Sequence, residues 1–242
     1  MLTSKLQHLS LLLFFICTTF VACSNGHHEN YQAKREEMIK KHVIWRGITD
    51  ESIVKAFNEV PREHFVLPEY KKDAYEDLEV PIGENQTLDR PYEDALILKA
   101  LALKPGDKVL EVGTGSGYLA SLMSKIADEV YTIEILNPLA ESARKRVAEL
   151  HYKNVTVKSG DGFIGWQEHA PFDAIILTCS PDEVPPALPE QLREGGRVVL
   201  PLGSDKKFQE LLLYEKQNGK LVLKQRIAPA EFVPMEGEIR KK

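Results

Sequence analysis

Cysteine and blocks of basic residues are scarce in this sequence. The three cysteines, Cys17, Cys23 and Cys179, are too few and too widely spaced for a disulfide framework or a cysteine metal site. The net charge is -5 and no long run of Lys and Arg occurs, which argues against nucleic acid as a partner. What remains is an ordinary globular composition, with 43% hydrophobic and 28% charged residues, in a chain long enough for one domain with additions.

The N-terminal stretch has the pattern of an export signal. Lys5 precedes an apolar run at 9–22 of roughly 14 residues, shorter than the ~20 that a membrane-spanning helix needs. A signal peptide over residues 1–22 is therefore predicted. The sequence Phe20-Val21-Ala22-Cys23 resembles a bacterial lipobox, which implies lipidation of Cys23, a polar tether at 23–30, and an exported lipoprotein. If the signal is not used, the protein is cytoplasmic.

The centre of the chain has the pattern of a βαβ unit. A short apolar run at 108–112 predicts a buried parallel strand, and Gly113, Gly115 and Gly117 follow it. A helix is predicted at 118–127 and a second strand at 129–133, which ends at Glu134. Glycines allow a ligand to approach the backbone closely, and an acid at the end of the second strand can accept hydrogen bonds from ribose hydroxyls. The pattern therefore predicts a nucleotide-type binding site.

Two common glycine motifs do not fit this turn. Tyr118 stands where a dinucleotide fingerprint requires its third glycine, and no Gly-Lys-Ser/Thr follows as in a P-loop. The sequence E-V-G-T-G-S-G-Y instead resembles motif I of the S-adenosylmethionine (SAM) methyltransferases. The resemblance implies SAM as the cofactor, bound by Glu111, Gly113, Thr114, Gly115, Gly117 and Glu134.

The remaining pattern places this unit within one larger α/β domain. Helices are predicted at 31–46, at 51–60 with Asp50 as the cap, at 92–103 and at 137–151. Strands are predicted at 154–158, 172–178 and 197–202, and a hairpin at 210–227 turns at Asn218-Gly219. The expected fold is a Rossmann-like, doubly wound, mostly parallel sheet with a C-terminal antiparallel hairpin and added N-terminal helices. Residues 31–242 form a single domain, divided into N-terminal helices and a substrate loop at 31–105 and a SAM-binding core at 106–242.

Further segments, in order, carry a more specific resemblance. VPREHF, AYED, PIGENQT, LKPGDKVLEVGTGSGY, APFDAIILT and FVPMEG are similar to segments of the protein-L-isoaspartate O-methyltransferase family, and the likeness extends from about Met38 to Gly237. It implies SAM-dependent methylation of the α-carboxylate of L-isoaspartyl residues in damaged proteins, with repair through a succinimide. Isoaspartyl proteins would be the partners of a monomeric enzyme.

The same resemblance assigns residues to the site. Asp161 and Gly162 would read the adenine, and Thr178 would lie beside the reacting methyl group at the end of its strand. Gln86, Thr87 and Asp89 lie in the substrate loop at 81–92, where Thr87 and Asp89 are the candidate catalytic residues. The tail at 232–235 is expected to pack near this site.

Asp89 departs from the family pattern, because the family carries a serine there that helps to hold the substrate carboxylate. An ionised Asp89 would repel that carboxylate. A protonated Asp89 would instead donate a hydrogen bond, and Arg90 is a candidate to neutralise the charge. The departure leaves two alternatives open: a methyltransferase acting on another acceptor, or a membrane-anchored binding module without catalysis.

Overall fold

The computed structural model describes residues 30–203 and 208–241. The predicted signal peptide, almost all of the tether and the lipidation site Cys23 lie outside these residues. Within them, no helix is both long and apolar enough to cross a bilayer.

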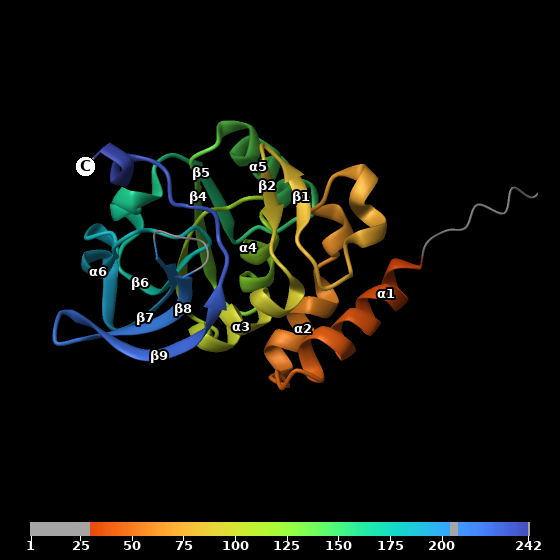
Figure 1. The fold of residues 1–242 in the computed structure, drawn as a ribbon, viewed down its shortest axis with the longest axis horizontal. Helices are drawn as coiled ribbons and strands as arrows, with labels where there is room; N and C mark the ends of the chain where they lie inside the picture. The colour runs from red at the N-terminus through yellow and green to blue at the C-terminus, as the bar shows by residue number, and fades with distance from the viewer. Residues whose placement is uncertain (1–29, 204–207, 242) are drawn as a thin grey trace, which may run out of the picture.

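A seven-stranded sheet forms the centre of the molecule, in the order β5-β4-β3-β6-β7-β8-β9. The first five strands in this order are parallel, and β8 and β9 are added antiparallel to them. Figure 1 shows these last two strands at the edge away from the N-terminal helices. The strands are β3 (Lys108–Val112), β4 (Glu129–Glu134), β5 (Val155–Ser159), β6 (Phe172–Leu177), β7 (Leu192–Leu202), β8 (Gln209–Gln217) and β9 (Lys220–Ala230). The predicted fold class is confirmed.

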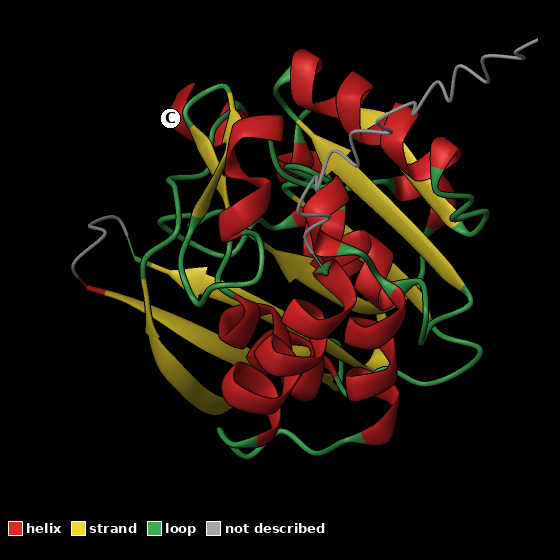
Figure 2. Ribbon diagram, turned by 90° about the vertical axis from the view of Figure 1, so that its right-hand side faces the viewer, coloured by secondary structure: helices red, strands yellow, loops and turns green. Residues whose placement is uncertain are grey.

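Both faces of the parallel part are covered, which explains its continuous apolar strands. Successive residues of β3 point to opposite faces, so Val109 belongs to one core and Leu110 to the other. A group of helices lies in front of the strands in Figure 2. The α-helices are α1 (Tyr31–Met38), α2 (Glu51–Glu59), α3 (Pro91–Leu101), α4 (Tyr118–Met123), α5 (Asn137–Glu149) and α6 (Ala187–Gln191), and the other helical segments are η1 (Ile39–Ile44), η2 (Arg62–His64), η3 (Pro68–Asp73), η4 (Gly162–Ile164), η5 (Gln167–His169) and η7 (Glu238–Lys241).

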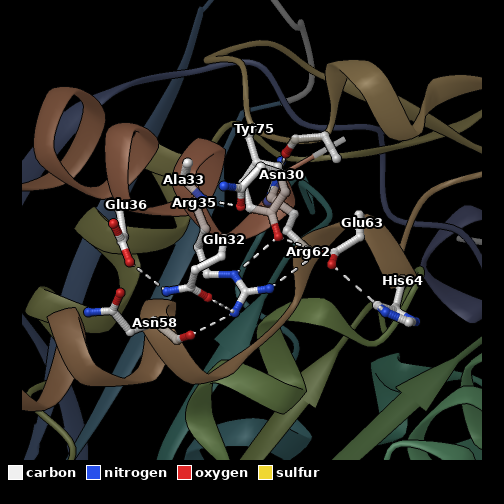
Figure 3. A network of polar contacts seen from close by, with 11 residues as sticks. Asn30, Gln32, Ala33, Arg35, Glu36, Asn58, Arg62, Glu63, His64 and Tyr75 are labelled. Carbon is white, nitrogen blue, oxygen red and sulfur yellow. Dashed lines mark hydrogen bonds and ion pairs between the residues drawn. The ribbon is translucent and has the colours of Figure 1, made fainter. Parts of the chain in front are cut away.

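A polar network attaches α1 to the body of the protein (Figure 3). Asn30 caps the helix by accepting the Ala33 N–H at 3.1 Å. Arg35 donates to the Tyr75 hydroxyl at 3.1 Å and to the Asn58 carbonyl at 2.9 Å, and it lies 3.5 Å from the Glu63 carboxylate. These contacts hold the first helix against α2 and η2.

One helix end follows from local sequence and another from a distant contact. Asp50 caps α2 as predicted, because its carboxylate accepts the Ser52 N–H at 2.9 Å. The helix predicted at 118–127 is shorter than expected, since α4 ends at Met123 and continues as tighter turns. There the side chain of Asn154, the residue before β5, donates to the Ser124 and Ala127 carbonyls. An amide from a distant segment thus satisfies carbonyls that a longer helix would have used.

Three other predicted boundaries are wrong. The helix predicted at 31–46 changes from α to π winding at Ile39 and ends at Ile44. Strand β7 begins at Leu192 rather than at 197 and includes the Gly195-Gly196 pair. The loop at 81–92 contains a hairpin of β1 (Val80–Gly83) and β2 (Gln86–Leu88).

Candidate active site

A cavity of about 250 Å³ opens at the carboxyl ends of β3, β4 and β6. The chain runs from β3 toward β4 and β5 on one side and returns to β6 and β7 on the other, so the cavity lies at the point where the strand order reverses. Ligands of open α/β sheets bind at this point. The wall is formed by the glycine turn, the ends of β4 and β6, the β1–β2 hairpin and the C-terminal segment 231–236.

The glycine turn brings the backbone of Gly113 to the edge of the cavity. Gly113 has φ +103°, and a Cβ there would collide with the Thr178 hydroxyl. That hydroxyl donates to the Gly113 carbonyl at 2.6 Å. Gly113, Thr114, Gly115 and Thr178 all line the cavity. Gly117 does not line it: with φ +86° it is the N-cap of α4 and packs toward Ala143 of α5.

Glu134, at the end of β4, faces the cavity with an oriented carboxylate. Its two oxygens accept the backbone N–H groups of Gly115 at 2.8 Å and Leu136 at 3.0 Å. An ionised carboxylate has about four acceptor positions, so about two remain for a ligand. Two ribose hydroxyls fit this arrangement.

Glu111 is a fully buried acid in the wall of the cavity. Its Oε2 accepts the Thr132 hydroxyl at 2.5 Å, and Thr132 Oγ1 lies 2.6 Å from Thr114 Oγ1. Its Oε1 has no partner among the described residues. Burial raises the pKa of Glu111 to about 8, with smaller contributions from Asp94 and Glu134, against the effect of Thr132. An unpaired, buried carboxyl oxygen at a cavity fits a positively charged ligand, and SAM carries both a sulfonium and an ammonium group.

The hairpin β1–β2 covers the other side of the cavity, where Gln86, Thr87 and Asp89 line the wall. Its turn places Glu84 and Asn85 at φ +52° and +57°, the backbone of a two-residue hairpin turn. The Thr87 hydroxyl lies 3.5 Å from a Glu79 carboxylate oxygen. The three predicted substrate residues therefore line the same cavity as the glycine turn.

The cation closest to Asp89 is one that sequence reasoning missed. Arg90 points to Glu79, at 3.9 Å, so its proposed role as the partner of Asp89 is not supported by the geometry. Arg62, from η2, is completely buried. It donates to the Asp89 carbonyl, to the Ala74 carbonyl at 2.8 Å and to Asp94 Oδ2 at 3.0 Å.

Gly162 and Asp161 are adjacent but occupy different environments. Gly162 lines the cavity, and a Cβ there would collide with Val112. Asp161 is not part of the wall. Its carboxylate accepts the Phe163 N–H at 2.9 Å and the Glu238 N–H at 2.7 Å. It therefore attaches the C-terminal segment to the start of η4.

The C-terminal segment packs over the site, as expected from the sequence. Ser180, just after β6, donates its N–H to the Val233 carbonyl and accepts the Met235 N–H, both at 2.8 Å. This pairing places residues 231–236 along the cavity, beside Thr178 and Cys179. Burial raises the pKa of Cys179 to about 12, so its thiol is a poor nucleophile. Within the described residues, no cluster of three potential metal ligands occurs.

Comparison with known proteins assigns this arrangement to a family. The family model described as protein-L-isoaspartate(D-aspartate) O-methyltransferase matches residues 33–240. A protein-L-isoaspartate O-methyltransferase of Opitutus terrae is 42% identical over 97% of this chain and 98% of its own length. One of Shewanella sediminis is 42% identical over 95% of this chain and 94% of its own.

Solved structures agree with this match. A protein-L-isoaspartate O-methyltransferase structure superposes with a TM-score of 0.77 at 32% identity, covering 85% of this chain and 67% of that one. A Plasmodium falciparum structure described as an enzyme of the same kind, in complex with S-adenosyl-L-homocysteine, gives a TM-score of 0.73 at 27% identity. That match covers 86% of this chain and 98% of the other.

Proposed function

The chain belongs to the protein-L-isoaspartate(D-aspartate) O-methyltransferase family, and on that premise we propose how its cavity carries out the reaction. The protein is a SAM-dependent enzyme that methylates the α-carboxylate of L-isoaspartyl residues in damaged proteins. One observation supports this most directly: the same cavity is lined by the acids for a SAM-type ligand and by the Gln86–Asp89 loop for the acceptor. The resulting methyl ester closes to a succinimide, which opens in part to normal aspartate.

The proposed mechanism depends on positioning rather than on a strong base. SAM, when bound, supplies an electrophilic methyl group. The acceptor carboxylate is ionised at pH 7, because carboxyl pKa values lie near 4, so it attacks without a general base. The roles of the protein are to align the two reactants and to exclude water, and alignment alone can lower such a barrier by about 7–11 kcal/mol.

We assign the cofactor contacts as follows. Glu134 accepts the ribose hydroxyls, since its carboxylate is already oriented by Gly115 and Leu136. The free oxygen of Glu111 faces the positive end of the methionine part. Gly113 and Gly162 keep the cavity wall tightly packed, because side chains at these positions would collide with Thr178 and Val112. Thr178 holds the Gly113 carbonyl in place.

Asp161 and Gly117 take modified roles in this proposal. Asp161 reads the adenine only if its carboxylate accepts a further hydrogen bond beside those from Phe163 and Glu238. Gly117 starts α4 and supports the turn from behind. Thr87 and Gln86 contact the acceptor peptide from the hairpin.

Location and assembly are further parts of the proposal. The apolar run at 9–22 and the lipobox-like Cys23 support an exported lipoprotein attached by acyl chains, of which two or more give stable anchoring. SAM is made in the cytoplasm, so an uncleaved or unused signal with cytoplasmic action is the competing proposal. Cell fractionation of the wild type and Cys23→Ser distinguishes them, because only a lipoprotein moves from the membrane to the soluble fraction on substitution. We also propose that the protein acts as a monomer.

The function is tested with labelled SAM and two peptides that differ only in an isoaspartyl or a normal aspartyl linkage. We expect base-labile methyl esters on the isoaspartyl peptide alone. If SAM binds by calorimetry but neither peptide is labelled, the acceptor is a different one. If SAM does not bind either, the chain is a binding module rather than an enzyme.

A further inference from the structure

The end of the β1–β2 hairpin carries an acid whose role in the proposed reaction needs an explanation. Asp89 lines the cavity, on the side that receives the isoaspartyl carboxylate in the proposed function, on which this inference rests. Two ionised carboxylates in contact repel each other, and in such pairs one of the two retains its proton. The question is which neighbours decide the charge of Asp89.

Four charged groups on surrounding elements act electrostatically on Asp89. Asp94 and Glu93 come from the first turn of α3, Glu79 precedes β1, and Arg62 comes from η2. Three of the four are acids. Each acidic neighbour disfavours the ionised form of Asp89, and of the four groups only Arg62 favours it.

Arg62 is held by other groups. Its Nη1 is 3.0 Å from Asp94 Oδ2, its Nε donates to the Ala74 carbonyl, and its Nη2 donates to the main-chain carbonyl of Asp89 rather than to the carboxyl group. The guanidinium also lies over the Tyr118 ring, 4.7 Å from its centre. Among the described residues no basic side chain comes within 4.0 Å of the Asp89 carboxyl. The buried guanidinium of Arg62 therefore forms its ion pair with Asp94 and not with Asp89.

We propose that Asp89 keeps its proton at neutral pH and donates a hydrogen bond to one oxygen of the isoaspartyl carboxylate, and that Asp94 and Arg62 are positioning residues that maintain this state. The other carboxylate oxygen stays free to accept the methyl group. The acid then replaces the neutral hydroxyl donor that the family resemblance places at this position. Arg62 also fixes the backbone of the loop, since it binds the Asp89 carbonyl directly.

The electrostatics of the pair agree with this arrangement. Burial, followed by the charges of Asp94 and Glu93, raises the pKa of Asp89 well above its usual range. Burial also raises the pKa of Asp94, to about 7, although Arg62 opposes the shift. The charge of Asp94 therefore affects the protonation of Asp89. Because only Asp94 has the hydrogen bond from Arg62, the first proton leaves from Asp94 and the second remains on Asp89.

The first test compares pH profiles of kcat/KM for an isoaspartyl peptide. The wild type should lose activity at alkaline pH, tending to about tenfold per pH unit once Asp89 ionises. Asp89→Asn and Asp89→Ser keep a donor that cannot ionise in this range, so the alkaline decrease should disappear. Asp89→Asn should lower kcat/KM at pH 6 by less than about tenfold, because one hydrogen bond to a charged group replaces another. Glu84→Gln, an exposed acid of the same hairpin outside the cavity wall, should keep the wild-type profile.

The second test separates positioning from simple structural support. Asp94→Asn removes a negative neighbour and releases Arg62, so the alkaline decrease should move to lower pH by about one unit, and Asp94→Glu should restore it. In the Asp89→Asn variant, Asp94→Asn should not change the pH profile of kcat/KM, because the alkaline decrease is already absent. If Asp94→Asn instead lowers kcat/KM equally at every pH, its role is structural only and the inference is wrong. A flat wild-type profile, or a decrease that persists unchanged in Asp89→Asn and Asp89→Ser, also contradicts it.

Failure of this inference differs visibly from failure of the proposed function. If the wild type does not label the isoaspartyl peptide at pH 7, the function is wrong. If it labels the peptide but all variants share one profile, the function stands and the protonated donor is rejected. Calorimetric titration with SAM at each pH confirms that the variants still bind the cofactor.

Discussion

Replacing Gly113 by alanine tests how the glycine turn is built. Gly113 has φ +103°, and a Cβ there would overlap the Thr178 hydroxyl, which already donates to the Gly113 carbonyl at 2.6 Å. Gly106 is a matched control, since its φ is +90° but a Cβ there meets nothing within 4 Å. Alanine at either position is strained by the positive φ angle, but only alanine at position 113 also collides with Thr178.

The size of the difference follows from these two costs. An unfavourable backbone conformation costs about 1–3 kcal/mol at either position, and overpacking at 113 adds about 1–3 kcal/mol. In a domain of this size each kcal/mol lowers Tm by about 2–4 °C. Gly113→Ala should therefore melt roughly 2–12 °C below Gly106→Ala in the same buffer, as measured by circular dichroism or calorimetry.

A double-mutant cycle identifies the cause. Thr178→Ala removes the hydroxyl that the new Cβ would strike, so adding Gly113→Ala to it should cost only the backbone strain. The coupling between the two sites should be about 1–3 kcal/mol. Equal melting temperatures for the 113 and 106 variants, or no coupling with position 178, would refute the close approach of these two residues.

Two further predictions concern the acids of the cavity. Glu134→Gln removes a charged acceptor, so SAM affinity should fall about 10–100-fold. The control Glu149→Gln, on the exposed side of α5, should leave SAM affinity unchanged. Equal SAM affinities for Glu134→Gln and the wild type would contradict the assignment of Glu134 to the ribose hydroxyls. The pKa of Glu111 is raised to about 8, so this acid is mostly protonated at pH 7 without ligand and ionises when a cation binds beside it. SAM binding should therefore release protons at pH 7, and the measured heat of binding should depend on the ionisation enthalpy of the buffer. The Glu111→Gln variant should release fewer protons on binding SAM. If the variant releases as many protons as the wild type, the titrating group is not Glu111.

The βαβ unit could be predicted from the sequence because its signals are local. The apolar run of β3, the alternate glycines and Glu134 lie within one short segment, and their geometry follows from neighbours in the chain. The parallel sheet could be predicted for the same reason, since its buried strands are apolar on both faces. Asp50 as a helix cap is a further local signal that the structure confirms.

The parts that could not be predicted depend on distant residues. Arg62 and Asp94 are far apart in sequence, and only the tertiary fold brings them together as a buried ion pair. Asp161 binds the Glu238 N–H at the far end of the chain, so its partner could not be inferred from the Ser-Gly-Asp-Gly turn. The β1–β2 hairpin was missed because Glu84-Asn85 lacks the glycine that usually marks a turn with two positive φ angles.

Repair of an isoaspartyl peptide measures the central claim directly. The protein is incubated with SAM and a peptide that contains one isoaspartyl linkage, and the isoaspartyl and aspartyl forms are separated by chromatography over time. We predict that the isoaspartyl form declines and the aspartyl form appears only when both protein and SAM are present, with Glu134→Gln much slower. An isoaspartyl peptide that stays unchanged under these conditions, while SAM is still bound, would contradict the function proposed for this cavity.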